Sequence, residues 1–117
     1  MGPEELQERL IDMAVAVGAI TNALPRTKFG RQIGNQLVRC GTSPMANYAE
    51  ACGSESKKDF IHKLGICLKE LRETRVWLRL VLKSQQVTDS KVGVLYDEID
   101  QLRRIIGKSI TTARSRR

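Results

Sequence analysis

The chain has 117 residues, enough for one domain with a buried core, so we expect a single domain over residues 1–117. Hydrophobic residues make up 41% of the sequence and aromatic residues only 4%. The core must therefore be aliphatic, which favours packed helices over a β-sheet, and the short apolar runs exclude a membrane-spanning protein. The net charge of +7 is uneven, with −3 on residues 1–24 and +10 on residues 25–117. This charge favours an anionic partner, first of all RNA or DNA.

The first two predicted helices are separated by a basic turn. Over residues 4–24, apolar side chains recur at steps of three and four, which indicates one helical stripe. Pro25 ends this helix because the residue before a proline disfavours helical geometry. The second segment, residues 31–52, contains Pro44. Ser43 and Pro44 could begin a new helix, but the apolar steps continue across them, so we expect one helix kinked near Pro44 rather than two short helices.

The third and fourth predicted helices each carry one long apolar seam. A serine at position 56, followed by Asp59, has the form of a capping box, so the third helix begins there and runs to about Ser84. Its seam consists of Phe60, Leu64, Cys67, Leu71, Thr74, Leu78 and Val81. The seam of the fourth helix consists of Leu95, Ile99, Leu102, Ile106, Ile110 and Ala113. Four amphipathic helices joined by short turns predict an all-α, up-down-up-down four-helix bundle.

The third helix also carries a second apolar patch, which lies beside its core seam at ~100° of rotation per residue. The patch consists of Ile66, Trp77 and Leu80. A wide core stripe, covered by the neighbouring helices, is one interpretation. An interface between subunits is the other, because exposed apolar patches mark contact sites and tryptophan is favoured there. Both interpretations stay open, and the second predicts a homo-oligomer.

Basic side chains gather on another face of the third helix and near the end of the chain. The first group is an arc with no acid of the same helix inside it: Lys69, Arg72, Arg75, Arg79 and Lys83. An ordinary solubilising face and a phosphate-binding surface both explain this arc. The second group lies in the segment from position 103 to the end of the sequence, which contains no acid, and its members are Arg103, Arg104, Lys108, Arg114, Arg116 and Arg117. Residues 114–117 form a basic tail. These two groups are the candidate nucleic-acid-binding residues.

The sequence contains no recognisable arrangement for catalysis. His62 is the sole histidine, and Asn47 and Glu50 are more simply explained as a buried hydrogen-bond pair or as caps of the next turn. There is no Gly-rich phosphate loop and no nucleophile with a nearby base. The three cysteines are Cys40, Cys52 and Cys67, and their spacing matches no metal or redox motif. We therefore expect a non-enzymatic cytoplasmic protein with reduced cysteines and with no cofactor and no metal.

Three segments resemble a known bacterial four-helix-bundle family. They are the run from Thr42 to Ala51 with its Ser-x-x-x-Asn-x-x-Glu pattern, the Asp-Phe pair at 59–60, and the Lys-Glu-x-x-Glu-Thr-x-x-Trp-Leu pattern at 69–78. The family includes proteins encoded in intervening sequences of large-subunit ribosomal RNA genes. The resemblance spans about residues 30–117 and implies the bundle fold, but it says little about function.

One branch of this family is the accessory variability determinant of diversity-generating retroelements. The segments at residues 76–80 and 98–107 look similar to that branch. The resemblance implies a homopentameric barrel with a basic surface that binds nucleic acid and a reverse transcriptase. We therefore expect a non-enzymatic, oligomeric, nucleic-acid-binding accessory protein. The alternative is a protein-interaction scaffold whose positive charge serves only solubility.

Overall fold

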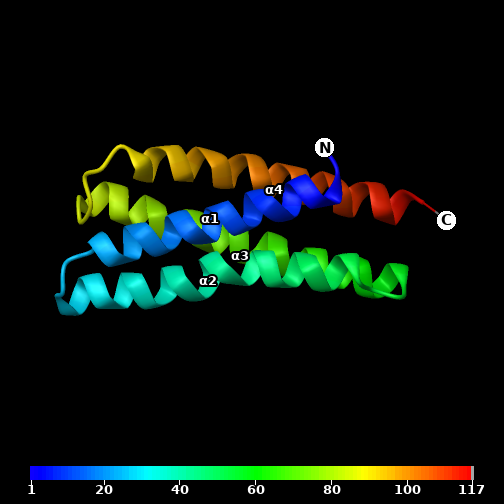
Figure 1. Ribbon diagram of the computed structural model, residues 1–117, viewed down its shortest axis with the longest axis horizontal. Helices are drawn as coiled ribbons and strands as arrows, with labels where there is room; N and C mark the ends of the chain where they lie inside the picture. Colours follow the sequence, from blue (N-terminus) through cyan, green and yellow to red (C-terminus); the bar gives the residue numbers. More distant parts are fainter. Residues whose placement is uncertain (117) are drawn as a thin grey trace.

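The computed structural model describes residues 1–116, and four α-helices account for nearly all of them. These are α1 (Pro3–Ala23), α2 (Lys28–Cys52), α3 (Lys57–Ser84) and α4 (Lys91–Ser115). They lie side by side in an elongated body of 50 × 21 × 20 Å (Figure 1). Each helix packs against the next in the chain and α4 packs back against α1, whereas the backbones of the diagonal pairs do not approach each other closely over the described residues. The predicted up-down-up-down four-helix bundle is confirmed.

Side-chain caps fix where two of the helices begin. The Ser56 hydroxyl accepts a hydrogen bond from the backbone N–H of Asp59 at 3.1 Å, as predicted for the start of α3. The Thr27 hydroxyl accepts from the backbone N–H of Gly30 at 3.0 Å in the same way. Because of this second cap, α2 begins at Lys28, earlier than predicted, and the expected basic turn is partly helical.

The second helix continues through its internal proline. Pro44 cannot donate a backbone hydrogen bond, which weakens the helix one turn earlier, yet α2 remains a single helix from Lys28 to Cys52. The Asn47 side-chain amide donates to the Ser43 carbonyl at 3.0 Å and to the Ser43 hydroxyl at 2.9 Å, which adds hydrogen bonds across residues 43–47, the turn that contains Pro44. The prediction of one helix rather than two is confirmed.

One buried stripe from each helix forms the core. All of the predicted seam residues of α3 and α4 are buried except Phe60 and Ala113, which are half-buried near one end of the bundle. The helices α1 and α2 approach each other closely at Gly41, where an added Cβ would lie 2.8 Å from Val17 Cγ1. Glycine therefore allows α1 and α2 to pack more closely than a larger residue would. None of the described helices is both long and apolar enough to cross a membrane.

Candidate nucleic-acid interface

The outward side of α3 presents a row of exposed cations, which we call the α3 ridge: Lys69, Arg72, Arg79 and Lys83. Among the residues that the structure describes, none of these four side chains forms an ion pair with an acid. Val76 lies between them with 67% of its surface exposed. From Lys69 to Lys83 the ridge extends over about 21 Å, because an α-helix rises 1.5 Å per residue. Four of the five predicted arc residues are therefore free to meet an anion.

Arg75, the fifth residue of the predicted arc, is already held by α4. Its Nε lies 3.3 Å from Asp100 Oδ1, and its Cζ lies 4.9 Å from the centre of the Tyr96 ring. An arginine over an aromatic ring gains a cation–π attraction in addition to its ion pair. Arg75 therefore bridges α3 and α4, and the prediction that it belongs to a free basic arc needs correction. Its guanidinium must give up protein partners before it can bind a phosphate.

Asp100 also binds two arginines of its own helix, and we call these three residues together with Arg75 the Asp100 cluster. Arg103 Nη2 donates to Asp100 Oδ1 at 2.7 Å, and Arg104 Nη2 lies 3.1 Å from Oδ2. The hydrogen bond from Arg103 and the charges of Arg103, Arg104 and Arg75 hold the pKa of the Asp100 carboxyl below its ordinary value. One carboxylate faces three guanidiniums, so the cluster keeps a positive charge. The side chain of Arg104 is 72% exposed, so the positive charge of the cluster is accessible at the surface.

The last turn of α4 contains part of the predicted basic tail. Arg114 lies inside the helix, which ends at Ser115, and Arg116 follows as the C-cap. The carbonyl oxygen of Arg116 accepts a hydrogen bond from Lys57 Nζ at the start of α3. Lys108, Arg114 and Arg116 are exposed, and cations at a helix C-terminus also complement the helix dipole. Arg117, the remaining residue of the predicted tail, lies outside the described residues.

The acids of α1 lie on the other side of the bundle. Glu4, Glu5, Glu8 and Asp12 are exposed, and the α1 backbone does not come close to that of α3 over the described residues. Across the seam between α1 and α4, Arg9 forms a two-pronged ion pair with Glu98, with distances of 2.6 and 2.9 Å. The molecule therefore has an acidic side on α1 and a basic side on α3 and α4, a separation that suits an anionic ligand.

The second apolar patch lies at the edge where α2 meets α3. Trp77 and Leu80 pack against the core and are half-buried, as is Ile66. The Trp77 indole N–H donates to Glu73 Oε2 at 3.3 Å, and Arg39 of α2 binds both Glu73 and Glu70. A wide core stripe thus accounts for part of the patch. The subunit interface at these residues stays a prediction.

The polar residues considered for catalysis have local structural partners. Asn47 and Glu50 do not pair with each other: Asn47 bonds to Ser43 one turn earlier, and Glu50 Oε1 lies 3.2 Å from Lys63 Nζ. His62 is exposed. Over the described part of the chain, no three His, Cys, Asp or Glu side chains come together in a way that could hold a metal ion.

The Asp100 cluster was not predicted, although three of its four residues have a signal in the sequence. Asp100, Arg103 and Arg104 stand three and four residues apart, the spacing at which side chains of one helix meet. The contacts of Arg75 with Tyr96 and Asp100 depend on how α3 and α4 are aligned, which no local pattern contains.

The fold and its surface define a class of protein: a small four-helix bundle with a strongly basic face on α3 and α4. The chain belongs to the 23S rRNA-intervening sequence protein family, whose model matches residues 5–108. It is similar to the crystal structure of a protein with unknown function from the S23 ribosomal protein family of Bacteroides thetaiotaomicron VPI-5482. The two chains are 27% identical with a TM-score of 0.86, and the match covers 95% of this chain and 99% of the other. No curated protein matches the chain.

The family match confirms the family resemblance and begins at residue 5, earlier in the chain than the resemblance, which was expected to begin near residue 30. Membership of the diversity-generating retroelement branch stays a prediction.

Proposed function

We propose that this protein is a non-enzymatic, RNA-binding accessory protein that contacts the phosphate backbone with the α3 ridge and the neighbouring cations of α4. The observation that carries the proposal is the row of four exposed cations on α3 that have no acidic partner among the described residues. A solubilising surface normally intersperses both signs of charge. On the α3 ridge, like charges at i, i+4 repel one another instead, and an anionic ligand would relieve this repulsion.

The two groups of cations contribute differently to this proposal. Each ridge cation can neutralise a phosphate, and so release the counterions condensed on the RNA, without losing a protein contact. Arg75 and Arg103 must first loosen their ion pairs with Asp100. Lys108, Arg114 and Arg116 extend the basic surface along α4. The ridge therefore supplies the main contacts, and four phosphates are the expected minimum.

The test is a salt titration of binding to a structured RNA. The logarithm of the binding constant should fall with the logarithm of salt concentration with a slope of about three, because each phosphate contact contributes roughly 0.7–0.9. The double substitution Arg72→Gln/Arg79→Gln should lower that slope by about 1.5. Both residues are exposed, so the free energy of unfolding should change by less than ~0.5 kcal/mol per substitution.

A matched control removes two charges from another exposed surface, with Arg26→Gln in the turn between α1 and α2 and Arg31→Gln near the start of α2. In a salt titration with an RNA that has no 5′-phosphate, this control should give the same slope as the natural chain. Absence of RNA binding at near-physiological salt, or a slope that the ridge substitutions do not alter, would support the competing scaffold function instead.

Two finer proposals come from the retroelement branch of the family. The first is a homo-oligomer, expected to be a pentamer, with Ile66, Trp77 and Leu80 in its interface. Light scattering behind a sizing column should show about five chains, and a monomer at micromolar concentration would contradict it. The second is a reverse transcriptase as protein partner, which predicts a reverse transcriptase gene beside this one.

A further inference from the structure

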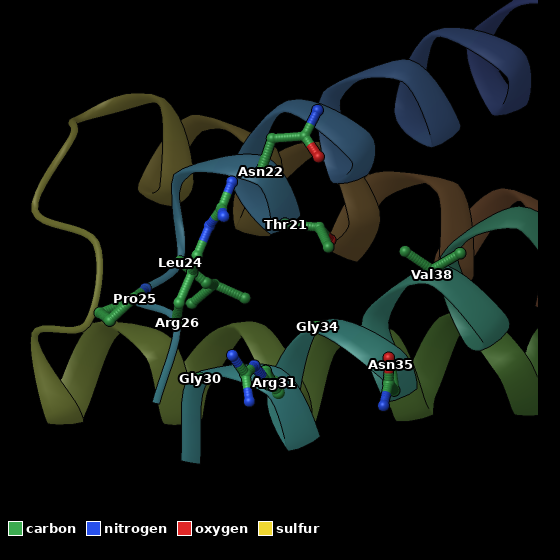
Figure 2. Close-up of a pocket in the computed structure, with 10 residues that line it drawn as sticks. All are labelled: Thr21, Asn22, Leu24, Pro25, Arg26, Gly30, Arg31, Gly34, Asn35 and Val38. Carbon is green, nitrogen blue, oxygen red and sulfur yellow. The ribbon is translucent and has the colours of Figure 1, made fainter. Parts of the chain in front are cut away.

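A cavity of about 370 Å³ opens at the corner where α1 turns into α2 (Figure 2). Its walls come from the last turns of α1, from the turn itself and from the first half of α2. Figure 2 shows Arg26 reaching from the turn toward Asn22 on α1, and Arg31 and Asn35 standing on α2. The volume lies within the range of small-molecule sites, about 300–1,000 Å³.

The polar groups at this cavity are not engaged by the protein. Arg26, Arg31, Asn22 and Asn35 form no side-chain hydrogen bond and no ion pair within residues 1–116. The Thr21 hydroxyl, on the cavity wall, is buried and has no hydrogen-bond partner in the described part of the chain. Buried polar groups in proteins are normally satisfied by protein, water or ligand. Four exposed polar side chains without a protein partner, with the buried and unpartnered Thr21 hydroxyl beside them, therefore indicate a place for a polar molecule.

The charge of this region selects the kind of molecule. Residues 13–49 contain no aspartate and no glutamate, but they contain four cations. Some arginines of the bundle are neutralised, as Arg9 is by Glu98 and Arg39 by Glu70. Arg26 and Arg31 form no ion pair with any acid within residues 1–116, and the planar N–H fork of a guanidinium is suited to binding phosphate oxygens. The cavity is therefore suited to an anion.

We propose that this cavity binds a phosphorylated ligand of nucleotide size. Arg26 and Arg31 hold the phosphate, and the amides of Asn22 and Asn35 bond to the sugar or the base. The cavity lies on the α1–α2 side of the bundle, away from the α3 ridge, so the site does not depend on the RNA-binding function proposed above. A free nucleotide and the 5′-phosphorylated end of an RNA strand present the same chemistry to it.

The test measures binding of the four nucleoside 5′-monophosphates to the full chain by calorimetry. The unphosphorylated nucleosides are measured in the same way for comparison. The double substitution Arg26→Gln/Arg31→Gln should weaken binding at least about tenfold, because charge-assisted hydrogen bonds to the phosphate are lost. Val38→Trp should weaken it similarly while keeping both charges, since Val38 lies exposed at the cavity rim and a larger side chain there fills the opening. The ridge variant Arg72→Gln/Arg79→Gln removes equal charge and should bind nucleotides as the natural chain does.

No binding of any monophosphate at millimolar concentration would overturn the proposal, as would equal binding of nucleoside and nucleotide. An equal loss of nucleotide affinity in the ridge variant and in Arg26→Gln/Arg31→Gln, which we call the corner variant, would overturn it too. Such a result would mean that only the net charge of the protein matters. A short RNA with a 5′-phosphate or a 5′-hydroxyl separates the two sources of ligand. Tighter binding of the phosphorylated strand, lost in the corner variant, identifies an RNA end, whereas equal binding of both strands alongside nucleotide binding identifies a free nucleotide.

Discussion

Replacing Gly41 with alanine tests how closely α1 and α2 pack. A Cβ at this position would lie 2.8 Å from Val17 Cγ1 and 2.9 Å from Val17 Cγ2, well inside ordinary contact distance. Val17 is fully buried, and its branched side chain has little rotamer freedom in a helix, so α1 itself must shift. Overpacking of this kind costs about 1–3 kcal/mol, whereas alanine in a helix interior gains up to about 1 kcal/mol over glycine. We expect Gly41→Ala to lower the free energy of unfolding by about 1 kcal/mol.

The matched control is Gly65→Ala on α3. No described atom outside its own helix turn lies within 4 Å of a Cβ built at Gly65. The substitution therefore brings only the gain in helix propensity, about 0.5–1 kcal/mol. The two variants should differ by about 2 kcal/mol, which is the steric part of the effect. Urea unfolding gives both values, at one protein concentration because association contributes to apparent stability.

A second substitution shows whether the steric partner is Val17. In a Val17→Ala background the Cβ that Gly41→Ala adds enters the space that the valine methyls leave, so the substitution should there be neutral or stabilising. This reversal would appear as a coupling of at least about 1 kcal/mol in the double-mutant cycle. If Gly41→Ala stabilises the natural chain as much as Gly65→Ala does, the inferred close packing of α1 and α2 is wrong.

The remaining predictions concern titratable groups. The lowered pKa of Asp100 means that its bonds stabilise the fold fully at neutral pH and are lost as the pH falls through that pKa. Asp100→Asn should therefore be less stable than the natural chain at pH 7, and the difference should vanish well below pH ~3.9; a difference that persists in acid would contradict this. Burial raises the pKa of Cys67 to about 12 and that of Cys40 above its ordinary value, whereas Cys52 is exposed. A thiol reagent at pH 8 should label Cys52 alone in the native protein and all three cysteines in urea, and rapid native labelling of Cys40 would refute the assignment.

The sequence was sufficient for the fold because each helix carries its own apolar period. The seam of α3 from Leu64 to Val81 is buried as predicted, since a single stripe at steps of three and four can face only one way. The start of α2 was missed because Thr27 caps it without an acid three residues later, so the usual capping-box signal is absent. Helix bodies follow from periodicity, whereas helix ends depend on single hydrogen bonds.

The candidate site was only partly predictable, because a helical projection treats each helix as if it stood alone. On α3 alone, Arg75 belongs to the same arc as Arg72 and Arg79. In the bundle, the core stripes fix the alignment of α3 and α4, which brings Asp100 within 3.3 Å of Arg75 and leaves the other two arginines unpaired among the described residues. A count of cations in the sequence therefore overestimates the charge available to a phosphate. The slope of a salt titration should be compared with the four ridge cations, since a guanidinium that loses a carboxylate as it gains a phosphate adds little to the free energy of binding.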